Sequence, residues 1–296
     1  MSRPLSTPGG PLATLLAGLL ISLLRALPRP LLLGCARGVG RLAMALGIRR
    51  RVALDNLAHA FPEKSLRERR AIAAGAYVNL AMAAAEGLLS ARGPEPSWVV
   101  TFENWAALAA AQEEGRGVLV AMAHLGSWEL LGELMAQRGI PIHAVVRPLK
   151  GVLNDVLMRA RVASGLKLIP ARGAIGGAVK ALRKGGVVVM LMDQALPSRS
   201  AVFVPFFGRP AATSPALSAA ALRSGAPVFA ASAARDGDAI RVVIEGPFPV
   251  PRTGDLRRDI EQHTATVTAA IERFIRRAPD QWLWLHRRWK VVPPGP

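Results

Sequence analysis

The residues best suited to chemistry are a histidine and a glutamate five positions apart, His124 and Glu129. An apolar run at 117–122 precedes them, and an apolar helical stripe starts at Leu130. This pattern predicts that His124 lies where a buried strand ends and Glu129 in the first turn of the next helix. A carboxylate there holds one imidazole nitrogen and leaves the other free as a general base. Such a base removes a proton from a hydroxyl, which then attacks an acyl carbonyl.

The other histidines give weaker signals. His59 and His263 lie on predicted helices, so we interpret them as surface or packing residues. His143 lies inside a predicted strand and is interpreted as structural. His286 stands in a segment rich in Trp and Arg and is a candidate for lining a site.

Apolar strands that alternate with amphipathic helices predict the scaffold for these residues. Strands are expected at 117–123, 141–146, 187–192, 226–232 and 239–244, and helices at 129–138, 151–164, 174–184, 214–223 and 255–277. This order indicates an α/β fold with a central, mostly parallel sheet flanked by helices. Residues 50–95 read as helical, with Ser65 as a helix cap, and 92–96 as a break.

Composition narrows the classes of partner. The 296 residues carry 38 Lys and Arg against 20 Asp and Glu, a net charge of +18, although 51% of the chain is hydrophobic. Such a chain suits an anionic membrane surface or an acidic carrier. Nucleic acid is a weaker option because aromatics are only 5% and no zinc-finger spacing or glycine-rich phosphate loop is present. The single Cys35 excludes an internal disulfide and offers no metal cluster, so we expect no metal and no cofactor.

The N-terminus carries the membrane signal. Residues 11–24 have no charge, but Arg25 interrupts the run before it reaches the roughly 20 apolar residues that span a bilayer. The segment could insert only if Arg25 reached the interface, and the arginines that follow suit the cytoplasmic side of an anchor. We interpret it as an anchor or interfacial helix; a cleaved signal peptide and a soluble core helix are the alternatives.

Three regions follow from this organisation. Residues 1–40 are expected to form the membrane anchor or interfacial helix, 41–98 a helical extension, and 99–296 the α/β domain. Residues 41–296 are expected to fold as one unit.

Several further stretches matter as a set. They are 56–63, 147–149 with Asn154 and Arg161, Asp193-Gln194, 204–208 (Val-Pro-Phe-Phe-Gly) and 281–290, which contains Trp-Leu-His-Arg-Arg-Trp-Lys. Together with the His124–Glu129 stretch, this set resembles the lipid A biosynthesis acyltransferases, the late lauroyl/myristoyl-transfer branch of the lysophospholipid acyltransferase superfamily. The resemblance runs from about Asn56 to Pro294. One departure is Ser127, where the family often has Asn; Ser also caps helices.

The resemblance implies a mechanism. His124 would be the general base that deprotonates a hydroxyl of a lipid acceptor, and Glu129 would orient it and stabilise the imidazolium. The acceptor oxygen would attack the thioester of an acyl donor directly, since no serine or cysteine nucleophile is needed. The donor would be an acyl carrier protein thioester or acyl-CoA.

The resemblance also implies substrate-binding residues. Arg147 and Arg161 would bind the phosphate of the acceptor, because a guanidinium matches phosphate oxygens. Asp193 and Gln194 end a predicted strand, where α/β sites gather. Each has an alternative: Arg161 could be a solvated helix-face charge, and Asp193 a turn or helix cap.

The C-terminal segment is expected to meet the membrane. We favour an interfacial belt over core packing for Trp282, Trp284 and Trp289, and expect Arg287 and Arg288 to meet lipid headgroups.

The implied partners are therefore a thioester donor, a phosphorylated glycolipid acceptor of the lipid A type and an anionic membrane, with no nucleic acid. The implied location is the bacterial inner membrane, with the catalytic domain on the cytoplasmic face. An acyl-CoA-dependent phosphatidylinositol mannoside acyltransferase and a non-catalytic basic membrane-binding protein are the alternatives. A glycerol-phosphate acyltransferase fits less well, because its Glu-Gly-Thr-Arg block is missing.

Overall fold

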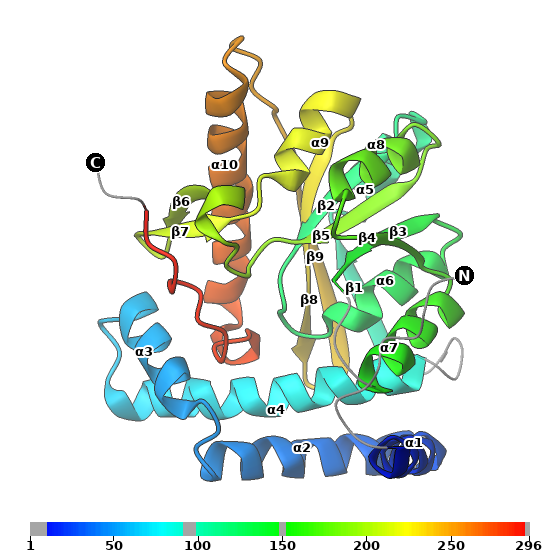
Figure 1. Ribbon diagram of the computed structural model, residues 1–296, viewed down its shortest axis with the longest axis vertical. Helices are drawn as coiled ribbons and strands as arrows, with labels where there is room; N and C mark the ends of the chain where they lie inside the picture. Colours follow the sequence, from blue (N-terminus) through cyan, green and yellow to red (C-terminus); the bar gives the residue numbers. More distant parts are fainter. Residues whose placement is uncertain (1–10, 91–98, 148–151, 294–296) are drawn as a thin grey trace.

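A seven-stranded sheet forms the centre of the computed structural model, which describes residues 11–90, 99–147 and 152–293 (Figure 1). In spatial order its strands are β1 (Val99–Glu103), β9 (Ala239–Phe248), β8 (Val228–Asp236), β2 (Val118–Met122), β5 (Val187–Leu191), β3 (Ile142–Val146) and β4 (Lys167–Pro170). Five of its six neighbouring pairs are parallel, and β8 pairs with β9 in the antiparallel sense. The expected mixed α/β fold with a mostly parallel sheet is confirmed.

Helices cover both faces of this sheet, which is why its central strands are apolar throughout. All five residues of β2 are buried, as expected for a parallel strand with helices on either side. One face carries α5 (Trp105–Glu113) and α6 (Trp128–Ala136), and the other carries α8 (Ala174–Leu182), α9 (Ala216–Ser224) and α10 (Leu256–Arg277). Helix α7 (Val152–Ala163) packs against β4 and α4 (Leu66–Ser90).

Helix α4 runs across one end of the sheet (Figure 1). It begins with a reciprocal cap, in which the Ser65 backbone N–H donates to the Glu68 carboxylate at 2.7 Å and the Glu68 N–H donates to Ser65 Oγ at 3.3 Å. The predicted Ser65 cap is therefore confirmed. The cap fixes where α4 starts, and the helix then brings the side chains of its second half under the strand ends.

Helix α2 (Arg29–Ala45) lies along α4, and α3 (Arg50–Ala60) follows it. The two long helices approach closely at Gly40, where a Cβ would lie 2.6 Å from the Val78 Cα atom. Any larger residue would push α2 away from α4. Leu32, Leu33 and Ala36 are buried beside this contact.

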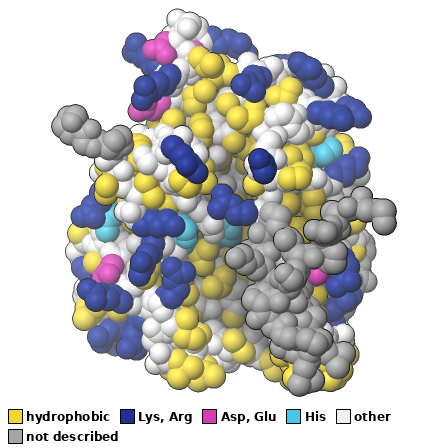
Figure 2. All heavy atoms as spheres, in the orientation of Figure 1, with side chains coloured by type: hydrophobic (Ala, Val, Ile, Leu, Met, Phe, Trp, Pro, Cys, Tyr) yellow, Lys and Arg dark blue, Asp and Glu magenta, His cyan; other side chains and the backbone are white. Residues whose placement is uncertain are grey.

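The N-terminal helices expose many apolar side chains, with a few arginines among them. Helix α1 (Pro11–Ala26) exposes leucines, as does α2, and more than half of the side-chain surface of Leu16, Leu23 and Leu42 is accessible. Figure 2 shows hydrophobic side chains at the lower edge of the molecule, over the region of α2. Exposed apolar surface of this extent marks an interaction site on a soluble protein or a contact with lipid.

Length and composition identify one candidate membrane span in the described residues, Leu66–Leu89 in α4. About half of this stretch, 56%, is buried inside the molecule, so the same pattern fits a core helix. The pair Arg29–Ala45 and Arg50–Ala60 passes the test only as one broken span, bent by 87°.

The structure adds strands that the sequence did not predict. These are β1, β4 and a separate antiparallel hairpin of β6 (Val202–Phe206) and β7 (Arg209–Thr213). Strand β4 has four residues, and a proline interrupts each strand of the hairpin, so neither shows a clear periodicity. The predicted break at 92–96 lies outside the described residues.

Candidate active site

His124 lies just beyond β2, at the end of the sheet that α4 crosses. The chain turns into α6 at Gly126, which has φ +61°. A Cβ at this position would collide with the carbonyl oxygen of Ala233, so the turn requires glycine. The turn holds His124 at the carboxyl end of a central strand, where open α/β sheets collect their functional groups.

Asp193 occupies the equivalent position on the neighbouring strand. Met122 at the end of β2 pairs with Leu191 at the end of β5, and His124 and Asp193 each lie two residues further on. Asp193 Oδ1 lies 2.8 Å from His124 Nδ1, and Asp193 Oδ2 accepts the backbone N–H of His124 at 2.9 Å. Because a carboxylate only accepts hydrogen bonds, Nδ1 is the protonated nitrogen of the neutral ring.

Asp193 is held ionised by its surroundings. Its side chain is almost fully buried, and Trp282 Nε1 donates to Oδ2 at 2.8 Å. Burial opposes the charge, but the neighbouring His124 and the hydrogen bonds from His124 and Trp282 outweigh it and lower the pKa of Asp193 to about 2. Asp193 is therefore a fixed negative charge beneath the imidazole.

The imidazole of His124 is partly accessible, with 19% of its side chain exposed. Burial disfavours its charged form, but Asp193 outweighs this effect, with a smaller contribution from Glu129, so the pKa of His124 is raised above its usual 6.5. The Gln194 amide nitrogen lies 3.4 Å from Nε2, and the Trp128 ring packs edge-on against the imidazole. Nε2 is the atom left to accept a proton.

Glu129 does not make the hydrogen bond to His124 that the sequence suggested. Its carboxylate pairs with Arg161 of α7 through two hydrogen bonds, from Nε at 3.0 Å and Nη2 at 2.6 Å, and accepts Trp128 Nε1 at 3.2 Å. The first turn of α6 directs Glu129 toward α7, where a guanidinium fork matches it. Asp193, and not Glu129, makes the hydrogen bond to the imidazole of His124, so its carboxylate does not act as a turn or helix cap.

The remaining predicted residues lie around this pair. Arg147 is exposed just past β3, at the same end of the sheet. Arg161 is 20% exposed in its side chain and bound to Glu129, so it is not a purely solvated helix-face charge. Gln194 follows Asp193 and contacts the imidazole. The structure thus places five of the six predicted site residues in two contacting groups, His124 with Asp193 and Gln194, and Glu129 with Arg161, which Trp128 links, while Arg147 stands apart at a strand end.

Comparison with known proteins identifies the family. Residues 7–291 match the family model of the bacterial lipid A biosynthesis acyltransferases. The chain belongs to this family. It is 32% identical to a lipid A biosynthesis palmitoleoyltransferase of Escherichia coli K12 over 274 residues, covering 91% of this chain and 88% of the relative. It is 31% identical to a lauroyltransferase and 27% to a myristoyltransferase of lipid A biosynthesis from the same organism, with 91% and 90% of this chain and 88% and 82% of the relatives covered.

The C-terminal segment of this acyltransferase forms part of the site. The Leu283 N–H donates to the His124 carbonyl at 3.2 Å, and Leu125 and Trp282 form an isolated β-bridge. Trp282 then reaches Asp193. The sequence gave no local signal for this contact, because the two residues are 89 positions apart.

Two predictions for this segment are wrong. Trp282 and Trp284 are 1% and 0% exposed and pack in the core, so they do not form an interfacial belt. Arg288 is 0% exposed; it donates to the Ala212 carbonyl at 2.7 Å and to Thr213 Oγ1 at 2.6 Å, and so does not meet lipid headgroups. Both indole N–H groups and the two terminal nitrogens of Arg288 find partners inside the fold, which makes burial tolerable, whereas Arg288 Nε has none. Arg287 is exposed, and its contact with lipid headgroups stays a prediction.

A buried ion pair supports the turn that follows His124. Glu86 of α4 is fully buried and receives two hydrogen bonds from the guanidinium of Arg235, at the end of β8, at 3.1 and 2.5 Å. Asn79, two turns earlier on the same face of α4, donates to the Gln281 carbonyl at 2.7 Å, and the Gly126 N–H donates to that same oxygen at 3.1 Å. Helix α4, β8 and the C-terminal segment therefore meet behind the turn.

The other histidines lie away from the His124–Asp193 pair, with one exception. His263 is fully buried in α10 against Ser218, and burial lowers its pKa to about 4. His59 contacts the Phe207 carbonyl, and His143 that of Pro141. His286 Nε2 accepts the N–H of Ala195 at 3.1 Å, which places it beside the site, in accordance with the expectation that it lines one.

Proposed function

We propose that this acyltransferase moves a fatty acyl chain from a thioester donor to a hydroxyl of a lipid A precursor, with His124 as the general base. The observation that carries the proposal is the hydrogen bond between His124 Nδ1 and buried, ionised Asp193. It leaves Nε2 without a proton and the imidazole partly accessible. That is the state a general base needs before it meets a hydroxyl.

The reaction balances without a covalent enzyme intermediate. His124 Nε2 takes the proton from the acceptor hydroxyl as its oxygen bonds to the thioester carbonyl carbon, and the carbonyl becomes an oxyanion. When the tetrahedral intermediate collapses, the carbon–sulfur bond breaks and the thiolate takes the proton from His124. Asp193 stabilises the imidazolium between the two steps. Glu129 adds a longer-range electrostatic contribution of the same sign.

Arg161 and Arg147 are proposed to bind the phosphate of the glycolipid acceptor. An arginine has five N–H donors, and Glu129 uses two of those of Arg161. The remaining donors are available to a phosphate, and Glu129 keeps the guanidinium plane fixed. Arg147, exposed past β3, supplies a second charge at the same end of the sheet. Gln194 is proposed to contact the substrate beside Nε2.

The exposed leucines of α1 and α2 support membrane association. A lipid surface is the proposed contact for this apolar side, with the chain on the cytoplasmic face of the bacterial inner membrane. The basic charge of the chain adds attraction to anionic headgroups. The same charge would steer an acidic acyl carrier protein to the chain as the donor, and acyl-CoA is the alternative.

Acyl transfer by the detergent-solubilised protein tests this proposal, with a lipid A precursor as acceptor and acyl carrier protein thioester as donor. His124→Ala should lower kcat/KM by roughly 10²–10⁴-fold with unchanged thermal stability. Activity within threefold of the unmodified protein, at matched amounts, would refute the mechanism. Transfer to a mannoside phospholipid but not to the lipid A precursor would show that the mannoside lipid, and not the lipid A precursor, is the acceptor. Binding to vesicles without any transfer would indicate the non-catalytic alternative.

A further inference from the structure

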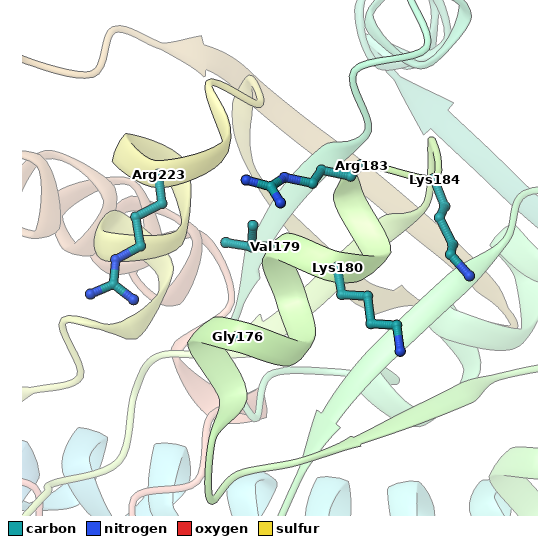
Figure 3. Close-up of a pocket in the computed structure, with 6 residues that line it drawn as sticks. All are labelled: Gly176, Val179, Lys180, Arg183, Lys184 and Arg223. Carbon is teal, nitrogen blue, oxygen red and sulfur yellow. The ribbon is translucent and has the colours of Figure 1, made fainter.

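The cavity between α8 and α9 stands apart from His124. Lys184, which lines it, precedes β5, whereas Asp193 follows β5, so the two lie at opposite ends of this strand. Figure 3 shows the four cationic side chains of its lining pointing to different sides of α8 and α9. This cavity is not part of the catalytic centre, and the groups that complete that centre lie around His124.

The proposed reaction places a negative charge on the former carbonyl oxygen of the donor. Preorganised N–H donors beside such an oxyanion are usually the largest single contribution to the catalysis of acyl transfer. In the tetrahedral intermediate the oxyanion and the attacking oxygen are bonded to the same carbon. Because the attacking oxygen lies against His124 Nε2, a donor for the oxyanion must also lie close to Nε2.

The side-chain amide of Gln194 lies at that point. Its nitrogen is 3.4 Å from His124 Nε2. Because Nε2 of the neutral ring carries no proton, only the NH₂ end of the amide makes a favourable contact with it. The donor end of Gln194 therefore faces the place where the acyl group must sit. The side chain is partly exposed, whereas Asp193 and Ala195 on either side of it are buried.

His286 holds the backbone next to Gln194. The Ala195 N–H donates to His286 Nε2 at 3.1 Å, so the neutral ring of His286 carries its proton on Nδ1. Burial lowers the pKa of His286 to about 4, and the ring therefore keeps this acceptor near pH 7. A protonated ring would turn an N–H group toward the N–H of Ala195.

Helix α3 anchors His286 in turn. Asn56 is buried, and its amide nitrogen donates to the carbonyl oxygens of Trp284 and His286, both at 2.7 Å. These hydrogen bonds match the two N–H groups of the amide and fix the backbone on both sides of Leu285. The stretch that begins at Asn56 and the C-terminal segment therefore meet beside the loop that carries Gln194.

Arg288 holds the next residue of that loop through a shared acceptor. The Leu196 N–H and Arg288 Nη1 both donate to the Ala212 carbonyl, at 3.4 and 2.7 Å. His286 and Arg288 thus secure the two residues that follow Gln194. A catalytic group needs such support, because it must be held to within about 0.5 Å of its working position.

We propose that Gln194 is the oxyanion donor of this active site and that His286 is the positioning residue that holds it there. A side-chain N–H of Gln194 donates a hydrogen bond to the former carbonyl oxygen as the acceptor oxygen bonds to the carbonyl carbon. Gln194 keeps its proton throughout, and the acceptor proton passes through His124 to the leaving thiolate. This inference rests on the proposed function, because it assigns a partner to the oxyanion of that reaction.

Gln194→Met keeps the length of the side chain and removes the donor. Its kcat should fall by roughly 10²–10³-fold, the usual effect of losing one oxyanion donor. The KM of each substrate should stay within about threefold of the unmodified value, whereas a raised KM with an unchanged kcat would make Gln194 a binding residue and refute the proposal. Gln262→Ala, at an exposed position of α10, is the control and should match the unmodified protein.

A donor whose thioester carbonyl is replaced by a thiocarbonyl tests the hydrogen bond itself. Sulfur accepts hydrogen bonds weakly, so Gln194 should favour the thioester over the dithioester. The ratio of the two kcat/KM values should fall roughly tenfold or more in Gln194→Met, since the intrinsic reactivities of the donors cancel between the two proteins. This ratio does not depend on the amount of folded protein. An unchanged ratio would refute the oxyanion role even where kcat falls.

Two variants test the positioning role of His286. His286→Phe keeps a ring but removes the acceptor for the Ala195 N–H, and His286→Gln offers an amide oxygen in its place. His286→Phe should lower both kcat and the thioester preference, and His286→Gln should recover most of each. In a Gln194→Met background, His286→Phe should change kcat little further, because both variants impair the same donor. Equal losses in the two backgrounds would show an independent role and refute the positioning.

The outcomes separate this proposal from the proposed function. A full kcat in Gln194→Met refutes the oxyanion role and leaves His124 and Asp193 intact as the base and its partner. Absence of transfer in the unmodified protein refutes both.

Discussion

The substitution Asp193→Asn distinguishes the contribution of Asp193 to catalysis from that of Glu129, the other carboxylate near His124. Asparagine keeps the shape of Asp193, and its side-chain oxygen can still accept Trp282 Nε1 and the His124 backbone N–H. Its NH₂ group then faces His124 Nδ1, where it can only donate. The imidazole responds by moving its proton to Nε2, the nitrogen that must be free to act as a base.

Two effects reduce the rate of acyl transfer in this variant. The fall of the Asp193 pKa from 3.8 to about 2 corresponds to roughly 2–3 kcal/mol of net stabilisation, mostly by charged His124. Losing that stabilisation in the transition state costs about 10²-fold in rate. The wrong tautomer adds a further loss, so kcat should fall by roughly 10³–10⁴-fold in total.

The assay is the pH dependence of kcat/KM for acyl transfer by the solubilised protein. A base must be neutral to act, so activity of the unmodified protein should rise with pH through the raised pKa of His124, above 6.5. Without Asp193, burial dominates and the pKa of His124 falls, so the acidic limb should move to lower pH. A rate within tenfold of the unmodified protein, or an unmoved limb in a variant that melts normally, would contradict the assigned role of Asp193.

The other predictions concern the neighbouring groups, the N-terminus and the core. Glu129→Gln and Arg161→Ala should each reduce activity, and the double variant should lose little more than the worse single one, because each removes the same ion pair; additive losses would show separate roles. Arg161→Ala should raise the KM for the glycolipid and leave that of the donor unchanged, and an unchanged acceptor KM removes Arg161 from the phosphate site. Deleting residues 1–30 should release much of the protein from membranes at high salt, and full retention in the pellet would contradict the anchor. Burial lowers the folded-state pKa of His263 to about 4, so its contribution to stability should be present above pH 6.5 and be lost as the pH falls toward 4, by up to about 3 kcal/mol. The variant His263→Gln should flatten this part of the plot of melting temperature against pH. An unchanged plot would refute the effect.

The sequence predicted five of the seven strands of the sheet, because these are apolar runs between amphipathic helices, and it missed the edge strands β1 and β4. Strand β2 is buried along its whole length and β5 at three of its five positions, so their patterns were clear. The hairpin β6–β7 lies outside the main sheet and contains prolines, and its pairing partner cannot be inferred from periodicity. The pattern of a strand reports burial, whereas strand pairing depends on contacts far along the chain.

The sequence identified the residues of the candidate site but not which of them contact one another. His124 and Glu129 are close in sequence, which favoured a direct contact between them. Asp193 is 69 positions away but lies at the same end of an adjacent parallel strand. A rule that compares the residues just past neighbouring strands would have found this pair. Trp282 had no comparable signal, because it lies in an irregular segment.

Trp282 is synthesised long after the residues that it contacts. Its side chain donates to Asp193, which lies 89 positions earlier in the chain, and the neighbouring Leu283 N–H donates to the His124 carbonyl. A ribosome therefore makes every strand of the sheet before it makes Trp282. The nascent chain can form its sheet while Asp193 still lacks the indole donor. A chain cut short before Trp282 would keep all seven strands of the sheet but lose this support of Asp193.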